Sequence, residues 1–274
     1  MSLSFTKMTA LGNDFVVVDG RELDILPIIP QAVRLCDRRF GIGGDGLIFI
    51  LPGTDQADFT MKIINSDGSE PEMCGNGIRC FARWLDDRGE FSGDTLRVQT
   101  GAGLLTITRE NSGYRVNMGK PILEPSQIPV NAENSLSIPY MIDNQQTYFT
   151  AVSMGNPHAV FFVSEITDTH VQKHGPHIEN DPLFPRKTNI EFIRVINDSE
   201  IDMRVWERGC GETFACGTGA CAAVVAGIRN NLHGNNVTVH LRGGDLKIEW
   251  DGISQSPVYM TGEAHPVFEG IVEL

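Results

Sequence analysis

The sequence has little positive charge and no long hydrophobic run. Its 274 residues include 22 lysine and arginine residues against 35 aspartate and glutamate residues, so the formal net charge is −13. No segment is rich in lysine or arginine, although a nucleic-acid surface normally needs a basic patch. No apolar run reaches the length of a membrane-spanning helix, and Met1–Lys7 lacks the basic and apolar parts of a signal peptide. We therefore expect a cytoplasmic protein that binds neither nucleic acid nor membrane.

Cysteine is also sparse, with six residues in the chain and none in a C-x-x-C pair. Cysteines of a cytoplasmic protein are reduced thiols, and without C-x-x-C spacing a structural zinc site is not expected. His170, His174 and His177 lie in one polar segment but have no carboxylate pattern near them. The sequence therefore predicts no metal site.

One glycine motif is typical of nucleotide binding but stands in the wrong place. Gly41–Gly46 fits the pattern G-x-G-x-x-G. The dinucleotide fingerprint follows a strand and opens a helix, whereas this copy follows a predicted helix and leads into a predicted strand. We interpret it as a turn.

Two of the cysteines stand in related motifs. Cys-Gly-Asn-Gly-Ile-Arg-Cys at 74–80 and Cys-Gly-Thr-Gly-Ala-Cys at 216–221 each place a cysteine directly before a turn that opens a predicted helix. At a helix N-terminus the macrodipole and the unpaired N–H groups favour a thiolate. The same N–H groups can bind a carboxylate. For the other four cysteines we expect inert packing roles: Cys36, Cys80, Cys210 and Cys221.

The two motifs belong to an internal repeat. Met-Gly-Asn-Pro-His at 154–158 resembles Leu-Gly-Asn-Asp-Phe at 11–15, and the shift between these segments (156 − 13) is almost the same as the shift between the two cysteines (216 − 74). Further matched pairs are 189–193 with 46–50 and 203–207 with 61–65. A near-constant offset over such a length indicates a duplicated domain.

Short strands dominate both halves, and each half has one principal helix. The predicted helix 218–228 contains no charged residue, so we expect it to be buried on all sides within a curled sheet. The segment 119–130 contains three prolines and is the predicted linker. The sequence thus predicts an α+β fold of two pseudo-symmetric repeated domains.

The repeat also suggests a reaction. If the halves pack about a two-fold axis, Cys74 and Cys216 face each other across one cleft. A planar carbanion would then meet a base on one side and an acid on the other, which inverts a stereocentre. Matched loop positions carry further polar residues that suggest a shared pocket: Asn13, Asn65, Asn156, Asn189, Glu207 and Arg208. A lone histidine is more often structural, but His158 follows the repeated Gly-Asn. Arg208 is suited to a carboxylate, and Glu207 to an ammonium group or to tuning a thiol.

Over essentially its whole length the chain resembles the diaminopimelate epimerases. The resemblance rests on Gly-Asn-Asp-Phe at 12–15, on Asn-Ser-Asp-Gly-Ser-Glu at 65–70 before the first cysteine motif, on 154–158, and on the segment 207–221. It implies a cofactor-independent epimerase that interconverts LL- and meso-2,6-diaminopimelate, without pyridoxal phosphate, in lysine and peptidoglycan precursor biosynthesis.

The resemblance also implies the domain plan. Each domain is a mixed, β-barrel-like sheet around a central helix, and the last strand returns to the first domain. We expect an N-terminal domain of 1–118 with 263–274, a C-terminal domain of 119–262, and an active site in the cleft between them. A homodimer is possible on the same ground.

By the same resemblance, Cys74 and Cys216 are the catalytic bases and act as a thiolate/thiol pair. Cys74 takes the proton from the LL isomer, and Cys216 reprotonates the carbon. The resemblance implies that the carboxylate at the reacting carbon is held by the N–H groups of Gly75, Asn76, Gly217 and Thr218. The distal end of the substrate is held by Asn65, Asn156, Asn189 and Arg208. Glu207 holds the amine of that end or acts on Cys216, and His158 lies by Cys74.

Two positions are less settled by the resemblance. Gly46 stands where some members of the family carry a glutamine that touches the substrate, and Cys210 has no assigned role.

Three alternatives stay open. A proline or hydroxyproline racemase would keep the fold, but such a substrate has one carboxylate and no distal zwitterion for Arg208. An isomerase with a carboxylate base would not need both cysteines. A thiol–disulfide redox protein would use Cys74 and Cys216 as a reversible pair.

Overall fold

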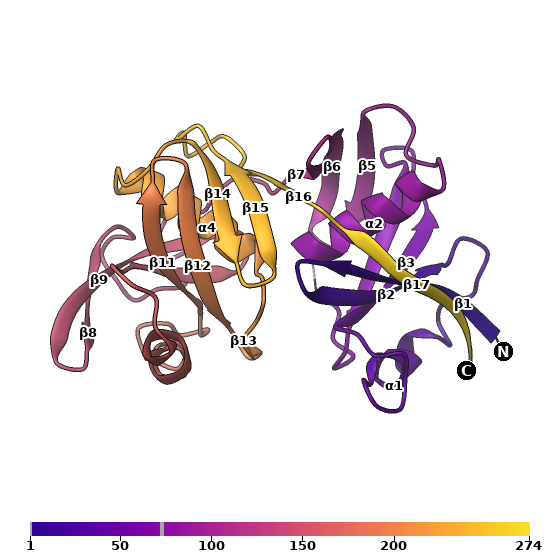
Figure 1. Ribbon diagram of the computed structural model, residues 1–274, viewed down its shortest axis with the longest axis horizontal. Coiled ribbons are helices and arrows are strands. Elements are labelled where there is room, and N and C mark those ends of the chain that lie inside the picture. The colour runs from indigo at the N-terminus through magenta and orange to yellow at the C-terminus, as the bar shows by residue number, and fades with distance from the viewer. Residues whose placement is uncertain (1, 72–73) are drawn as a thin grey trace. The chain divides into compact units, whose positions relative to one another are not determined.

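The structure is a computed structural model that describes residues 2–71 and 74–274. The chain forms two compact units (Figure 1). Unit 1 comprises Met1–Val116 and Thr261–Leu274, and unit 2 comprises Asn117–Met260. The end of the chain therefore belongs to the same unit as its beginning. In the described part of the chain no helix is long and apolar enough to span a membrane.

Unit 1 is built mainly of strands, with a 3-10 turn at Ile29–Gln31 and two helices, α1 (Ala32–Cys36) and α2 (Gly75–Asp87). Antiparallel and parallel pairings alternate along the chain: β1–β2 is antiparallel, β2–β3 parallel, β3–β4 antiparallel, β4–β5 parallel and β5–β6 antiparallel. The strands are β1 Ser2–Ala10, β2 Asn13–Asp19, β3 Gly46–Pro52, β4 Phe59–Asn65, β5 Thr95–Thr100, β6 Gly103–Glu110, β7 Gly113–Asn117 and β17 His265–Glu273.

Unit 2 repeats this order of pairing. Here β9–β10 is antiparallel, β10–β11 parallel, β11–β12 antiparallel, β12–β14 parallel and β14–β15 antiparallel. The strands are β8 Ile138–Ile142, β9 Gln145–Ser153, β10 Pro157–Phe162, β11 Asn189–Asn197, β12 Glu200–Glu207, β13 Gly211–Glu212, β14 Asn236–Leu241 and β15 Gly244–Glu249; β16 (Tyr259–Gly262) lies where the chain passes from unit 2 back to unit 1. The helices are a π-helical segment Thr169–His174, α3 (Gly175–Glu179) and α4 (Gly217–Arg229). The predicted α+β fold of two repeated halves is confirmed.

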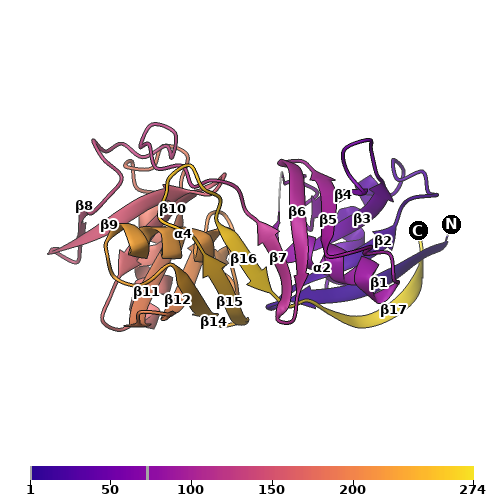
Figure 2. The same cartoon turned by 90° about the horizontal axis from the view of Figure 1, so that it is seen from above.

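Each unit has one long helix among its strands, α2 in unit 1 and α4 in unit 2 (Figures 1 and 2). Helix α4 is buried at Gly217 and throughout Gly219–Gly227, as its lack of charge predicts. Both helices end in the same way. Glu90 donates to Leu85 O at 2.9 Å and Leu232 donates to Gly227 O at 3.0 Å, which are the six-to-one bonds of a Schellman motif.

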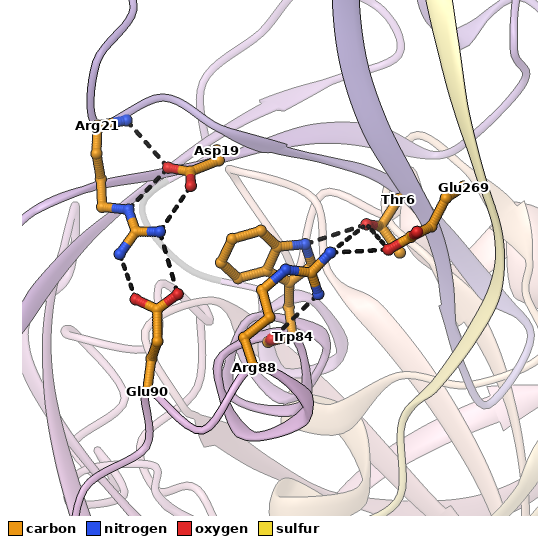
Figure 3. Close-up of polar contacts among 7 residues, drawn as sticks. All are labelled: Thr6, Asp19, Arg21, Trp84, Arg88, Glu90 and Glu269. Carbon is orange, nitrogen blue, oxygen red and sulfur yellow. Dashed lines mark hydrogen bonds and ion pairs between the residues drawn. The ribbon is translucent and has the colours of Figure 1, made fainter.

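The C-terminal strand β17 is attached to unit 1 by more than its antiparallel pairing with β1. Arg88, which follows α2, donates to Glu269 Oε1 of β17 at 2.8 Å (Figure 3). The Arg88 guanidinium lies 3.9 Å from the centre of the Trp84 ring, and Trp84 Nε1 donates to Thr6 Oγ1 of β1 at 3.1 Å. A cation over an aromatic ring and a shared hydroxyl thus connect the end of the chain to α2.

The predicted linker 119–130 is part of unit 2. Ile122 N donates to Ser153 O at 2.8 Å, and Ser153 N donates to Ile122 O at 3.0 Å. Ile128 and Val130 are buried in the apolar cluster of unit 2. The prolines of this segment therefore shape an ordered edge of the unit, because its apolar residues find a core to pack against.

Candidate active site

Cys216 is the N-cap of α4, with extended backbone angles of φ −128° and ψ 111°. Its Sγ accepts a hydrogen bond from Gly219 N at 3.4 Å and lies 3.4 Å from Thr218 Oγ1. Burial, and then the charges of Glu207 and Glu191, raise the pKa of the Cys216 thiol well above its ordinary value. The expectation that a helix N-terminus lowers this pKa is wrong for Cys216, because burial and two carboxylates outweigh the hydrogen bonds to the sulfur.

Glu207, at the end of β12, is in direct contact with Cys216. The Cys216 thiol and the Thr213 hydroxyl both donate hydrogen bonds to its carboxyl group. Burial raises the pKa of Glu207, although these hydrogen bonds and the charge of His158 act in the opposite direction. Glu207 is therefore placed to act on the thiol.

His158 on β10 is fully buried between two oxygen atoms. Its Nδ1 lies 2.7 Å from Glu191 Oε1, and its Nε2 lies 3.0 Å from Asn156 Oδ1. Both side chains of the His158–Glu191 pair are 0% exposed. Glu191 was not predicted as a site residue. Its signal in the sequence is that it is a lone charged residue inside the otherwise apolar strand segment Ile190–Ile193.

Asn189 and Arg208 meet through the backbone. Asn189 Oδ1 accepts from Arg208 N at 3.0 Å, while Asn189 Nδ2 donates to Pro157 O at 2.8 Å. Arg208 itself is partly exposed, and its Nη1 donates to Arg186 O at 3.2 Å. Glu179, also missed from the sequence, accepts from Gly209 N at 3.0 Å and is buried. Glu179 and Asn189 together fix the turn that carries Arg208.

Cys74 is the N-cap of α2 and matches Cys216 closely, with φ −138° and ψ 112°. Its Sγ accepts from Gly77 N at 3.3 Å. Beside it, the Asn76 amide donates to Asn13 Oδ1. Arg79, which is 0% exposed, donates to Asn76 Oδ1 at 2.7 Å and to Gly75 O at 3.0 Å. A buried guanidinium thus holds the loop that follows Cys74.

A polar network continues from Asn13. Asn13 Nδ2 donates to Asp45 Oδ2 at 2.9 Å. The neighbouring Asp14 pairs with Lys7 at 2.6 Å and with Arg38 at 2.6 Å. Burial opposes ionisation of Asp14, but the hydrogen bonds and charges of Arg38 and Lys7 prevail and lower its pKa to about 2.

Two further positions considered in unit 1 are Asn65, the last residue of β4, and Gly46, the first residue of β3. Asn65 donates through Nδ2 to Ser69 Oγ at 2.9 Å, within a turn, and pairs with Gly46 across β3 and β4. A Cβ atom at Gly46 would lie 2.9 Å from Ile64 O, so the backbone leaves no room there for a side chain.

The predicted carboxylate sites are the first turns of the two long helices. Gly75 and Asn76 open α2, and Gly217 and Thr218 open α4. The N–H groups of the first helical residues have no acceptor within a helix. In both helices the third N–H group is bound by the cysteine sulfur, so the two preceding N–H groups are the ones that can hold an anion.

Within unit 1 the structure brings Cys74, Gly75, Asn76 and Asn13 together. Within unit 2 the Cys216 group includes Gly217, Thr218 and Glu207, and His158 contacts Asn156. A cavity of about 500 Å³ lies elsewhere in unit 1, lined by Thr6, Met8, Trp84, Asp87, Arg88 and Pro266–Glu269. Among residues 2–71 and 74–274, no three His, Cys, Asp or Glu side chains are grouped as metal ligands.

Known proteins resemble this chain over its full length. The family model for diaminopimelate epimerase matches residues 5–124 and 150–267. The diaminopimelate epimerase of Desulfitobacterium hafniense is 52% identical over 281 residues, covering 98% of both chains, and that of Moorella thermoacetica is 51% identical over 276 residues with the same coverage.

A solved structure supports the fold. The hydroxyproline epimerase of Agrobacterium vitis has a TM-score of 0.71 at 13% sequence identity, covering 99% of this chain and 92% of that one. The two cysteine motifs, the repeated topology and the sequence matches agree with one another. This chain belongs to the diaminopimelate epimerase family.

Proposed function

We propose that this protein is an isomerase that interconverts LL- and meso-2,6-diaminopimelate, in the synthesis of lysine and of peptidoglycan precursors. Membership of the diaminopimelate epimerase family supports this substrate. The enzyme needs no cofactor on this proposal, because two thiols perform both proton transfers.

One observation carries the proposal. Cys74 and Cys216 are the N-caps of the two long helices, and their φ and ψ angles nearly coincide. Each helix stands in a unit with the same alternation of parallel and antiparallel strands. Two acid–base groups in matched settings are what inversion of a carbon centre requires.

The reaction has two proton transfers. The Cys74 thiolate removes the α-proton of the LL isomer, so the C–H bond breaks and an S–H bond forms. The carbanion is planar, and its negative charge spreads onto the adjacent carboxylate, which the N–H groups of both helix N-termini hold. The Cys216 thiol then gives its proton to the opposite face of the carbon and becomes a thiolate. The reverse reaction exchanges these roles.

The distal, non-reacting end of the substrate is held by Arg208 together with Asn65, Asn156 and Asn189. Contact between Asn189 and the Arg208 backbone supports this grouping. Glu207 tunes the Cys216 thiol, since it accepts a hydrogen bond from that thiol.

The proposal extends to cellular setting and assembly. We place the enzyme in the cytoplasm, where its cysteines stay reduced, and expect a homodimer on the family resemblance. Exposed apolar side chains on β17, Val267, Phe268 and Ile271, favour burial against a second copy. Light scattering on the purified protein tests this, and a monomer at micromolar concentration would contradict it.

The central test is exchange at the α-carbon in deuterium oxide. The reduced protein should incorporate deuterium into diaminopimelate with no added cofactor. Cys74→Ser and Cys216→Ser should each abolish epimerisation while the protein stays folded, because serine also caps a helix but its hydroxyl is a far weaker acid. Near-native turnover in either variant excludes the two-base mechanism. Turnover of proline instead of diaminopimelate would favour a proline racemase.

A further inference from the structure

Glu191 is a buried carboxylate beneath the first turn of α4. It is 0% exposed, and its Oε1 accepts the only hydrogen bond found for this carboxylate within the described residues, from His158 Nδ1 at 2.7 Å. Its Oε2 is buried without a hydrogen-bond partner in the same part of the chain. A buried carboxylate with an unsatisfied oxygen costs stability, so packing alone does not explain a glutamate here.

The position of Glu191 relative to Cys216 is set by Gly219. A Cβ atom added to Gly219 would lie 2.7 Å from Glu191 Oε1 and 3.3 Å from Cys216 Cβ. The Gly219 N–H group also donates to Cys216 Sγ. The carboxylate and the cysteine therefore both lie next to the same glycine.

Unit 1 contains the matched position without the charge. His158 pairs with Asn189 across β10 and β11, and Phe15 pairs with Gly46 across β2 and β3. The separation in sequence between the paired residues is the same in both units (189 − 158 and 46 − 15). The two parallel pairs of strands are therefore equivalent, residue by residue.

Two residues further along each second strand, Glu191 of unit 2 corresponds to Ile48 of unit 1. A Cβ atom at Gly77, the counterpart of Gly219, would meet Ile48 Cδ1 at 3.2 Å. The same scaffold thus folds with apolar residues, Phe15 and Ile48, at the two matched positions, and the histidine–glutamate pair of unit 2 is not required by the fold.

We propose that Glu191 is a positioning residue of the epimerisation: it orients His158 and places a negative charge beneath Cys216. This inference rests on the proposed catalytic role of Cys216. By accepting a hydrogen bond from His158 Nδ1–H, Glu191 fixes the imidazole so that Nε2 faces Asn156. The charge disfavours the Cys216 thiolate, so the resting enzyme keeps its proton on Cys216.

Two titratable groups act on the Cys216 thiol, Glu207 from β12 and Glu191 from β11. A third, His158 from β10, contacts Glu191 and acts on Glu207. Glu207 hydrogen-bonds the thiol directly, whereas Glu191 acts through space and through the histidine. Glu191 therefore contributes a charge that can be removed without breaking a contact to the sulfur.

The first test replaces the charge and keeps the shape. In Glu191→Gln the amide oxygen can still accept from His158 Nδ1. Only the negative charge beside Cys216 is lost, so we expect kcat to fall about 10- to 100-fold through the altered acidity of the thiol, without a lower unfolding midpoint. Glu191→Asp keeps the charge and should restore part of the activity, although its side chain is shorter. A role in packing alone predicts the reverse order, with Gln close to the unmodified enzyme and Asp the worse variant.

The second test measures the ionisation of the Cys216 thiol directly. The ultraviolet absorbance of the thiolate is titrated in Cys74→Ser and in Cys74→Ser/Cys216→Ser, and the difference isolates Cys216. Adding Glu191→Gln to both proteins should move this ionisation to lower pH. Asp181→Asn is the matched control, because Asp181 is a carboxylate of unit 2 that accepts from Tyr140 Oη at 2.8 Å; it should leave the titration unchanged.

The third test replaces two residues of unit 2 with the residues that unit 1 has at the matched positions, Phe15 and Ile48. The resulting variant, His158→Phe/Glu191→Ile, should therefore fold with an equal or higher unfolding midpoint and still lose activity about 100-fold or more. This double variant still tests the proposal if Glu191→Gln fails to fold. Native turnover in this double variant, or an unmoved Cys216 titration in Glu191→Gln, overturns the proposal. Activity in Cys74→Ser or Cys216→Ser would instead overturn the proposed function.

Discussion

Replacing Gly219 with alanine should destabilise unit 2, whereas the equivalent change at Gly77 should not destabilise unit 1. Both glycines occupy the third position of a long helix after a cysteine cap. Alanine is favoured over glycine inside a helix by up to about 1 kcal/mol. The same substitution at the two positions is therefore a matched pair in which only the neighbours differ.

The atoms around each glycine decide whether alanine stabilises or destabilises the unit. At Gly219 the new Cβ would lie 2.7 Å from Glu191 Oε1, much closer than the 3.4 Å at which ordinary contact begins. The same oxygen is held 2.7 Å from His158 Nδ1, so moving it away stretches a buried hydrogen bond. Losing that bond costs about 1.5–3 kcal/mol, and overpacking adds about 1–3 kcal/mol. Against the gain in helix propensity, the net loss of stability is about 2 kcal/mol or more.

At Gly77 the overlap is small. The nearest atom is Ile48 Cδ1 at 3.2 Å, which is only slightly closer than an ordinary contact of 3.4 Å, and it is the far end of a side chain that can move. We expect the stability of unit 1 to change by less than about 0.5 kcal/mol.

Hydrogen exchange measured by mass spectrometry resolves the two units separately. Peptides from β11 and α4 should lose protection in Gly219→Ala, and peptides from α2 should keep theirs in Gly77→Ala. Equal protection in the two variants would refute the reasoning from Glu191 packing.

Three further predictions concern other contacts. Because the folded-state pKa of Asp14 is lowered to about 2 from 3.8, its stabilising effect is complete above about pH 4 and is lost as the pH falls through about 2; Asp14→Asn should remove this part of the acid dependence of the urea midpoint. Arg79→Lys loses the fork that reaches several acceptors, so protection of α2 against hydrogen exchange should fall by about 3 kcal/mol; unchanged protection would contradict the buried network. On the proposed two-base mechanism, mild oxidation should join Cys74 to Cys216 and inactivate the enzyme until reductant is added, and mass spectrometry that finds both thiols free in the oxidised, inactive protein would contradict that mechanism.

Much of the fold could be predicted from the chain because it depends on local pattern and on repetition. The near-constant offset between matched segments (156 − 13 and 216 − 74) indicated the duplication, and the alternating strand pairs of the two units follow it. Helix α4 could be placed in a core because none of the residues 218–228 is charged. The two cysteine N-caps could also be predicted from the sequence, because each cap is a hydrogen bond between a cysteine and the glycine three positions later.

Other features depend on distant segments. The charge of Arg79 gives no sign in the sequence that this side chain is completely buried. The prolines of 119–130 predict a linker, yet their segment packs into unit 2. Burial and backbone pairing across strands decide both outcomes, and neither leaves a local pattern.

The sequence by itself determined the family, the duplicated fold and the two cysteines at helix N-termini. Only the tertiary structure decided the environment of those cysteines. A helix N-terminus taken alone favours a thiolate, but burial, and then the charges of Glu207 on β12 and Glu191 on β11, raise the pKa of Cys216. The pairing of His158 with Glu191 likewise exists only because β10 and β11 run parallel in one register. Electrostatic effects act across space, so the chain order that identifies a cysteine does not fix its protonation state.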